Sequence, residues 1–279
     1  MRKLLSRAAA LLLAGVMTAA VAGCGKNSDS EAKDTAKKWT ELDQTQITEA
    51  MGLGWNLGNQ LEASSGGLPS ETCWGNPEIT KDLIDTVKAQ GFKTVRIPVS
   101  YLDMIGDGPD YKIDTDWLDR VQEVVDYVVD NDMFAIVNMH GDGYYTVDHS
   151  WLLCAEDDDK QTEIKDKYGK VWTQIADRFK DYDQHLIFES MNEEFNNDYG
   201  KPDANAYENI NAYNQIFVDS VRATGSNNEK RWLLLPGWNT NIEYTAGDDY
   251  NFKIPTDHCI NRSKAMFPGY NLLELSIGE

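Results

Sequence analysis

The most constraining feature of this sequence is a regular alternation of short apolar runs with longer amphipathic patterns. The apolar runs are rich in β-branched and aromatic residues, which is typical of strands. Because most of them are apolar on both faces, they predict a parallel sheet that is covered by helices. The runs occupy residues 54–57, 94–99, 134–139, 186–188 and 232–235.

Each gap between two apolar runs holds a pattern of apolar residues at helical spacing. Asp114 and Thr115 are capping candidates in front of the second pattern. Gly91 and Gly225 follow the first and the last pattern, where glycine suits the left-handed conformation that ends many helices. The predicted helices lie within residues 79–90, 115–130, 164–179 and 207–221.

This alternation predicts an α/β fold. The five steps follow one another at intervals of roughly forty residues, which suits a TIM (β/α)8 barrel with loop insertions. A doubly wound sheet is the alternative, but no Gly-x-Gly-x-x-Gly follows the first apolar run, so the usual nucleotide-binding form is not favoured. We therefore expect about the first five β/α units of a barrel.

The amino terminus has the layout of a secretory signal. Basic residues are followed by an apolar run, residues 8–22, that is too short and too rich in small residues for a comfortable membrane span. The small residues before Cys24 resemble the cleavage site of a bacterial lipoprotein, which implies that Cys24 becomes the lipidated first residue. We expect an extracytoplasmic, cell-surface lipoprotein; an ordinary secretory peptide is the alternative.

The sequence thus divides into three parts. Residues 25–38 are small and polar, with hardly any apolar side chain, and indicate a flexible tether. The expected boundaries place a signal peptide at residues 1–23, the tether at 24–38 and one large domain at 39–279.

The charge of the chain disfavours anionic partners. It has 26 basic and 46 acidic side chains, and residues 1–23 hold three of the basic ones, which leaves 23 against 46, or a net charge of −23. Nucleic acids and anionic membrane surfaces are bound by Lys and Arg that face phosphate. We expect no nucleic-acid partner, membrane attachment only through Cys24, and a monomer that binds a neutral polymer.

Cysteines and histidines give no metal pattern. Cys73, Cys154 and Cys259 lie at wide, irregular spacing, and either one disulfide with a spare thiol or three free thiols fits them. The four histidines form no pair of ligands at the spacing of zinc fingers or metalloproteases. We expect neither a metal nor a cofactor.

The segment Phe188-Glu189-Ser190-Met191-Asn192-Glu193-Glu194 places carboxylates where a buried strand ends. Cleaving a glycosidic bond with retention needs one protonated carboxyl group and a carboxylate nucleophile about 5 Å away. Glu193 is the candidate acid, and Asn192 is suited to hold a sugar 2-hydroxyl. The alternative is a solvated strand end without a catalytic role.

Other candidate residues also fall at predicted strand ends, which converge at the mouth of a TIM barrel. Arg96 needs a carboxylate partner, either a catalytic one or a structural one. His140 can donate to a sugar hydroxyl or have a structural role. Tryptophan faces can stack on pyranose rings, with core packing as the alternative; the candidates are Trp55, Trp74, Trp151 and Trp238.

From about Trp39 to Asp257 the chain resembles glycoside hydrolase family 5, the cellulase and endoglucanase family. The matching segments are residues 54–59 with 61–63, 71–77, 95–100, 138–140 and 192–193.

The resemblance implies a TIM-barrel catalytic domain at 39–279 and a retaining endo-β-1,4-glucanase, with mannan, xyloglucan and lichenan as rival substrates. It further implies that Glu193 is the acid/base, that Asn192 and His140 bind the sugar, and that Arg96 supports the nucleophile. Glu194 stands where the family usually has proline, and it could disturb the proton affinity of Glu193.

The carboxyl terminus departs from the family pattern. Residues 241–279 number 39, whereas three further β/α units would need roughly 90 residues. Ser276-Ile277-Gly278-Glu279 imitates the family's nucleophile motif, so Glu279 is a weak nucleophile candidate. We expect a truncated barrel that, as given, has little or no turnover and in which Arg96 lacks its carboxylate partner, whereas the full-length parent form should hydrolyse β-glucan with retention. The alternative function is an inactive carbohydrate-binding surface lipoprotein or a truncated remnant.

Overall fold

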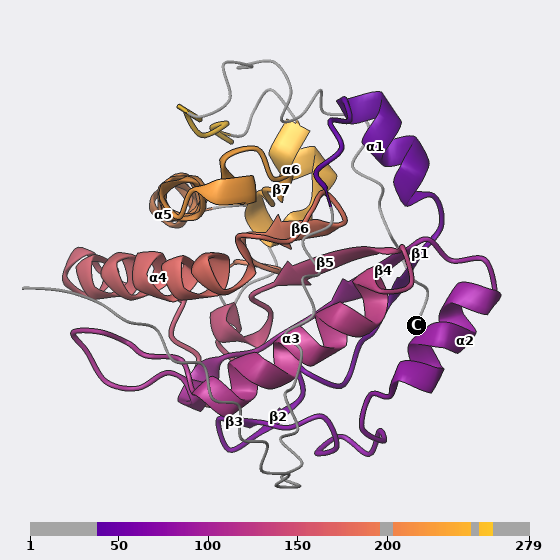
Figure 1. The fold of residues 1–279 in the computed structure, drawn as a ribbon. Coiled ribbons are helices and arrows are strands. Elements are labelled where there is room, and N and C mark those ends of the chain that lie inside the picture. Colours follow the sequence, from indigo (N-terminus) through magenta and orange to yellow (C-terminus); the bar gives the residue numbers. More distant parts are fainter. Residues whose placement is uncertain (1–37, 196–202, 247–250, 259–279) are drawn as a thin grey trace, which may run out of the picture. The chain divides into compact units, whose positions relative to one another are not determined.

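The structure is a computed structural model, and it describes residues 38–195, 203–246 and 251–258. Its centre is a five-stranded sheet in the order β1-β4-β5-β6-β7, in which every neighbouring pair is parallel (Figure 1). The strands are β1 Gly54–Asn56, β4 Thr94–Ile97, β5 Phe134–Asn138, β6 Leu186–Glu189 and β7 Leu233–Leu234. All five strands lie within or next to the apolar runs that predicted them.

The strand order settles the choice between the two predicted sheets for the described residues. The strands follow chain order across the sheet without a reversal, as in a (β/α)8 barrel, whereas a doubly wound sheet reverses at its switch point. All five residues of β5 are buried, so helices or loops cover both faces of this strand. β4 stops at Ile97 because Pro98 has no N–H to donate to a neighbouring strand.

Four long helices follow one another around the outside of the sheet (Figure 1). Each begins behind a side chain that accepts a backbone N–H, namely Thr80, Asp114, Asp157 and Asp203. Gly91 and Gly225 follow the first and last of these helices with φ of 94° and 70°, in the region that favours glycine. The helices are α2 Lys81–Ala89, α3 Thr115–Val129, α4 Asp158–Phe179 and α5 Ala204–Ala223.

Several short elements were not predicted from the sequence. Helix α1 Gln44–Met51 begins with a capping box, in which Asp43 and Gln46 bond each other's backbone N–H. A small hairpin, β2 Ser64–Ser65 and β3 Leu68–Pro69, lies after β1. The remaining elements are the 3-10 turns η1 Leu102–Met104, η2 Gly141–Gly143, η3 Ser226–Glu229 and η4 Trp238–Thr240, and helix α6 Ile242–Ala246.

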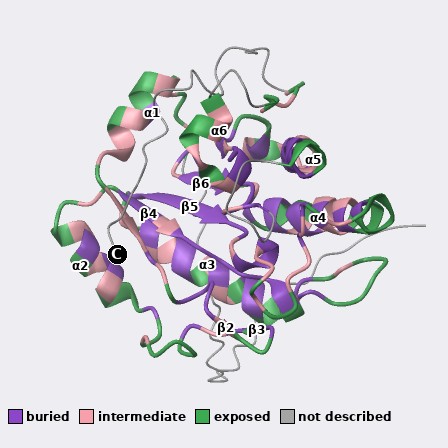
Figure 2. Cartoon of the chain, turned by 180° about the vertical axis from the view of Figure 1, so that it is seen from behind, coloured by how far each residue is buried: buried purple, intermediate pink, exposed green. Residues whose placement is uncertain are grey.

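The core lies between the sheet and the helix layer, where buried residues gather (Figure 2). Trp172 of α4 packs against Phe217 of α5 with ring centroids 4.5 Å apart, and against Phe188 of β6 at 5.7 Å. The Trp172–Phe217 pair is edge-to-face, and such a pair adds to the free energy of burying the rings. This packing fixes the position of β6, whose carboxyl end precedes the candidate acid Glu193.

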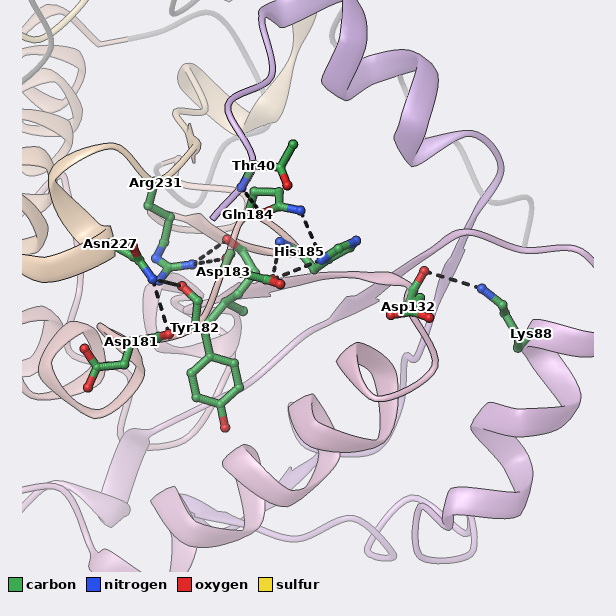
Figure 3. Close-up of polar contacts among 11 residues, drawn as sticks. Thr40, Lys88, Asp132, Asp181, Tyr182, Asp183, Gln184, His185, Asn227 and Arg231 are labelled. Atoms are coloured by element: carbon green, nitrogen blue, oxygen red, sulfur yellow. Dashed lines mark hydrogen bonds and ion pairs between the residues drawn. The ribbon is translucent and has the colours of Figure 1, made fainter. Parts of the chain in front are cut away.

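The amino end of β6 is held by a buried arginine (Figure 3). Arg231 is fully buried and donates to the carbonyl oxygens of Phe179, Tyr182, Asp183 and Leu186 at 2.7–3.1 Å. Burial lowers the pKa of Arg231 to about 9. The guanidinium thus satisfies the carbonyl groups at the end of α4 and in the turn that leads into β6.

Candidate active site

The candidate site is built on an ion pair between β4 and β6, the two strands that flank β5 in the sheet. Arg96 of β4 donates from Nε to Glu189 Oε2 at 2.8 Å and from Nη2 to Glu189 Oε1 at 2.7 Å. The two side chains are only 18% and 10% exposed. The expectation that Arg96 lacks a carboxylate partner is therefore wrong: Glu189, which the sequence analysis did not single out, is its partner, and the pair has bidentate geometry.

Arg96 also orients Asn192. Its Nη2 donates to Asn192 Oδ1 at 2.7 Å, so the amide oxygen of Asn192 is occupied. The amide nitrogen donates one hydrogen to the hydroxyl of Tyr144 at 2.5 Å. An amide nitrogen carries two hydrogens, so the second one is not used by this bond.

Tyr144 joins Asn192 to the candidate acid. Its hydroxyl accepts from Asn192 and donates to Glu193 Oε2 at 2.8 Å, and Glu193 itself is partly exposed. Burial and the nearby Glu193 raise the pKa of Tyr144, so its hydroxyl stays protonated and acts as a donor. Tyr144 was not predicted from the sequence, because it lies in a loop after β5; its only signal was its position four residues after His140.

The tautomer of His140 follows from its neighbours. Asn138 Oδ1 accepts from the backbone N–H of Val99 at 3.2 Å, which orients the amide so that Nδ2 faces His140 Nδ1 at 3.2 Å and Glu189 Oε1 at 3.2 Å. Since Nδ2 can only donate, His140 Nδ1 accepts. The ring proton of neutral His140 therefore lies on Nε2, which is a hydrogen-bond donor.

We expect His140 to stay neutral throughout the physiological pH range. Burial, and secondarily the charge of Arg96, lower its pKa from 6.5 to about 3. In the unfolded chain this group titrates near 6.5, so its contribution to the free energy of unfolding is fully present above that pH and is lost as the pH falls towards about 3. A ring-nitrogen NMR titration checks this, and protonation of His140 above about pH 5 would contradict it.

Glu194 does not share the environment of Glu193. Its carboxyl is fully buried against Gly143, and its Oε2 has no hydrogen-bond partner among the described residues. Burial, and secondarily Asp142, raise the pKa of Glu194 well above its usual value. The neutral side chain therefore adds no negative charge beside Glu193. The sequence had suggested such a charge, because Glu194 directly follows Glu193.

The four candidate tryptophans differ in their environments. Trp74 is 52% exposed, and its indole N–H donates to Ser64 O at 2.9 Å. Trp151 donates to Asp142 Oδ1 at 2.7 Å, and Lys167 Nζ lies 4.2 Å from its ring centroid. Trp55 is partly buried on β1 and packs against the core. Each of these three leaves some of its surface accessible.

Trp238 is the exception among the tryptophans. Its side chain is fully buried, and its ring stacks on Tyr207 with the centroids 6.2 Å apart. A ring enclosed in this way has no free face for a pyranose, so the structure contradicts the prediction that Trp238 is a sugar platform. Trp238 is therefore a core residue, which was the alternative prediction.

Several predicted residues lie outside the described residues. These are Glu279, Cys24 and Cys259, together with the signal peptide at 1–23 and all of the tether except Lys38. Cys73 and Cys154 both have free thiols, the first exposed and the second buried. Within 38–195, 203–246 and 251–258, no three His, Cys, Asp or Glu side chains are grouped as metal ligands, and no helix is long and apolar enough to cross a membrane.

Some known proteins are more than half identical to this chain over the residues they share. Endoglucanase A of Paenibacillus barcinonensis is 53% identical over 250 residues, which is 90% of this chain and 60% of that protein. A family 5 xyloglucanase structure from Paenibacillus pabuli is 58% identical with a TM-score of 0.75, covering 77% of this chain and 59% of that one.

A broad-specificity endoglucanase from Ruminococcus champanellensis with bound cellotriose is 40% identical with a TM-score of 0.70, over 80% of this chain and 64% of that one. The chain thus spans about three-fifths of the length of these relatives. The model of the cellulase family, glycosyl hydrolase family 5, matches residues 58–267. This match extends over most of the sequence and includes every residue of the Arg96–Glu189–Asn192–Tyr144–Glu193 cluster, and the chain therefore belongs to glycosyl hydrolase family 5.

Proposed function

We propose that this protein hydrolyses internal β-1,4 bonds of a glucan with retention of configuration, and that Glu193 is the general acid/base. The observation that supports this most strongly is the connected cluster in which Arg96 orients Asn192, and Tyr144 joins Asn192 to Glu193. Glu193 is partly exposed at the end of this cluster, where a substrate can reach its carboxyl group.

In this mechanism Glu193 protonates the oxygen of the leaving sugar and later removes a proton from the attacking water. The Tyr144 hydroxyl donates to Glu193 Oε2 and so fixes the orientation of its carboxyl group. The free amide hydrogen of Asn192 and the Nε2 proton of His140 face sugar hydroxyls, where such bonds strengthen as the oxocarbenium-like transition state forms.

The first step also needs a carboxylate nucleophile on the opposite side of the anomeric carbon. Glu279 is the candidate that the family motif suggests. Glu189 is unsuited to the role, because both of its oxygens are bound to Arg96 and one also accepts from Asn138. We propose Trp74, Trp151 and Trp55 as sugar-stacking residues.

Xyloglucan is a second candidate substrate, and the similarity to the Paenibacillus pabuli xyloglucanase favours it. The test is reducing-sugar release from carboxymethylcellulose, xyloglucan and mannan, with the anomer of the first product followed by NMR. We expect cleavage of β-glucan or xyloglucan with retention. Binding of these polymers without any hydrolysis would instead support the alternative of an inactive carbohydrate-binding protein, and inversion would exclude the proposed mechanism.

We further propose that Cys24 is lipidated after removal of residues 1–23 and that residues 24–38 tether the domain to a bacterial surface. The basic start, apolar run and small residues before Cys24 support this. Metabolic labelling with a fatty acid tests it: label that persists in a Cys24→Ser variant would rule out Cys24 as the anchor.

A further inference from the structure

One arginine closes the loop of residues 71–79, which follows the β2–β3 hairpin. Arg120 of α3 donates from Nε to Glu71 Oε1 at 2.5 Å and from Nη2 to Glu71 Oε2 at 3.0 Å. The same Nη2 donates to the carbonyl oxygen of Ile79 at 2.7 Å, and Glu71 Oε2 accepts from the N–H of Ile79 at 2.8 Å. Arg120 therefore binds both ends of the loop at once.

This closure is largely protected from water. The side chain of Glu71 is 9% exposed and that of Arg120 is 21% exposed. A bidentate pair in such a setting holds its geometry better than an exposed ion pair, because solvent screens it less and its planar fork fixes the direction of both bonds. The loop has no helix or strand of its own, so these bonds replace the order that secondary structure would provide.

The loop carries Trp74 on its exposed side. Bonds from the loop to residues that follow β1 fix its other side: Trp74 Nε1 donates to Ser64 O, and Asn76 Nδ2 donates to Asn59 O, both at 2.9 Å. The exposed indole is held by the bond of its own N–H and by the bonds that close the two ends of the loop. It therefore loses little conformational freedom when a sugar stacks on it. Arg120 lies in the helix layer and uses its guanidinium for Glu71, Ile79 and Glu123.

We propose that the Glu71–Arg120 pair positions Trp74 as a preorganised stacking platform for a β-glucan chain. The proposal rests on the proposed function, since it assigns Trp74 to the same substrate. Glu71 and Arg120 act through the loop and do not touch the sugar. The pair therefore sets the affinity for glucan chains that reach Trp74.

The binding test uses cellohexaose and isothermal titration with the full chain, in which every protein also carries Glu193→Gln so that the ligand is not cleaved. Arg120→Met is expected to weaken binding about five- to tenfold, because the loop must then be ordered when the sugar binds. In a Trp74→Ala background the same change is expected to have no further effect. Independent, additive losses from the two substitutions, or unchanged affinity in Arg120→Met, would overturn the proposal.

The mobility of the loop can be measured independently of sugar binding. Cys73 has an exposed thiol in this loop, whereas Cys154 is buried, so a nitroxide can be attached at Cys73 once Cys24 and Cys259 are replaced by serine. Arg120→Met should make this label more mobile, and Arg120→Lys should have an intermediate effect, because lysine keeps the charge but not the fork. An unchanged spectrum in both variants would overturn the proposal.

The matched control is Arg178→Met. Arg178 of α4 also pairs with α3, through Asp119 and Gln122, but this site is exposed and these bonds involve no residue of the loop. Arg178→Met should change neither the mobility of the label at Cys73 nor the affinity for cellohexaose. If the label becomes mobile in Arg120→Met while the Glu193→Gln protein binds cellohexaose equally with and without Trp74→Ala, the role of the pair in ordering the loop stands. In that case the stacking role of Trp74 is wrong.

Discussion

Replacing Glu193 with glutamine is expected to lower kcat on an unactivated β-glucan by about 10³-fold or more, since an amide can neither protonate the leaving oxygen nor activate water. Tyr144 and Asn192 keep their mutual hydrogen bond in this variant, so the fold should be unaffected. The measurement is initial-rate kinetics on β-glucan, with a thermal transition to show that the variant is folded.

Glu194→Gln is the matched control for this prediction. Glu194 is adjacent in sequence and identical in chemistry, but its carboxyl is buried and its raised pKa keeps it neutral, so glutamine mimics the form already present. We expect its kcat to stay within about threefold of wild type. Azide should restore turnover of an activated aryl glycoside by Glu193→Gln and give a β-glycosyl azide. Wild-type turnover of β-glucan by Glu193→Gln would remove Glu193 from the mechanism.

Replacing Arg96 with methionine is expected to reduce the free energy of unfolding by about 3–5 kcal/mol, because the Glu189 carboxylate is then buried without its partner. Asn192 loses the bond that orients its amide oxygen, so activity should fall as well. Chemical denaturation followed by circular dichroism measures the change in stability.

Two variants separate the buried pair from a general effect of losing an arginine. Arg178→Met removes an exposed pair with Asp119 and should cost at most about 1 kcal/mol. A double variant, Arg96→Met with Glu189→Leu, should recover part of the loss, because it removes the uncompensated charge. Equal destabilisation by Arg96→Met and Arg178→Met would show that the Arg96–Glu189 pair does not stabilise the fold.

Local patterns in the sequence were sufficient to predict the main elements. The apolar runs gave all five strands of the parallel sheet, and helical spacing gave α2, α3, α4 and α5. The start of α4 is six residues earlier than predicted, because the cap Asp157 precedes a first turn that is polar and therefore shows no apolar periodicity. The short helix α1 was missed for a similar reason: its only buried residue is Ile47.

The sequence by itself also determined which residues lie at strand ends, and hence the candidates Arg96, His140, Asn192 and Glu193. Continuous apolar runs and helical patterns encode this, because they depend on neighbours within one element. Which side chains bond to these residues is decided only by the tertiary structure. Arg96 meets Glu189 across 93 positions of sequence, and Tyr144 meets Glu193 across 49, only because parallel strands bring their ends together. The burial of Trp238 was likewise decided by packing, since nothing in its local sequence shows that Tyr207 covers its ring.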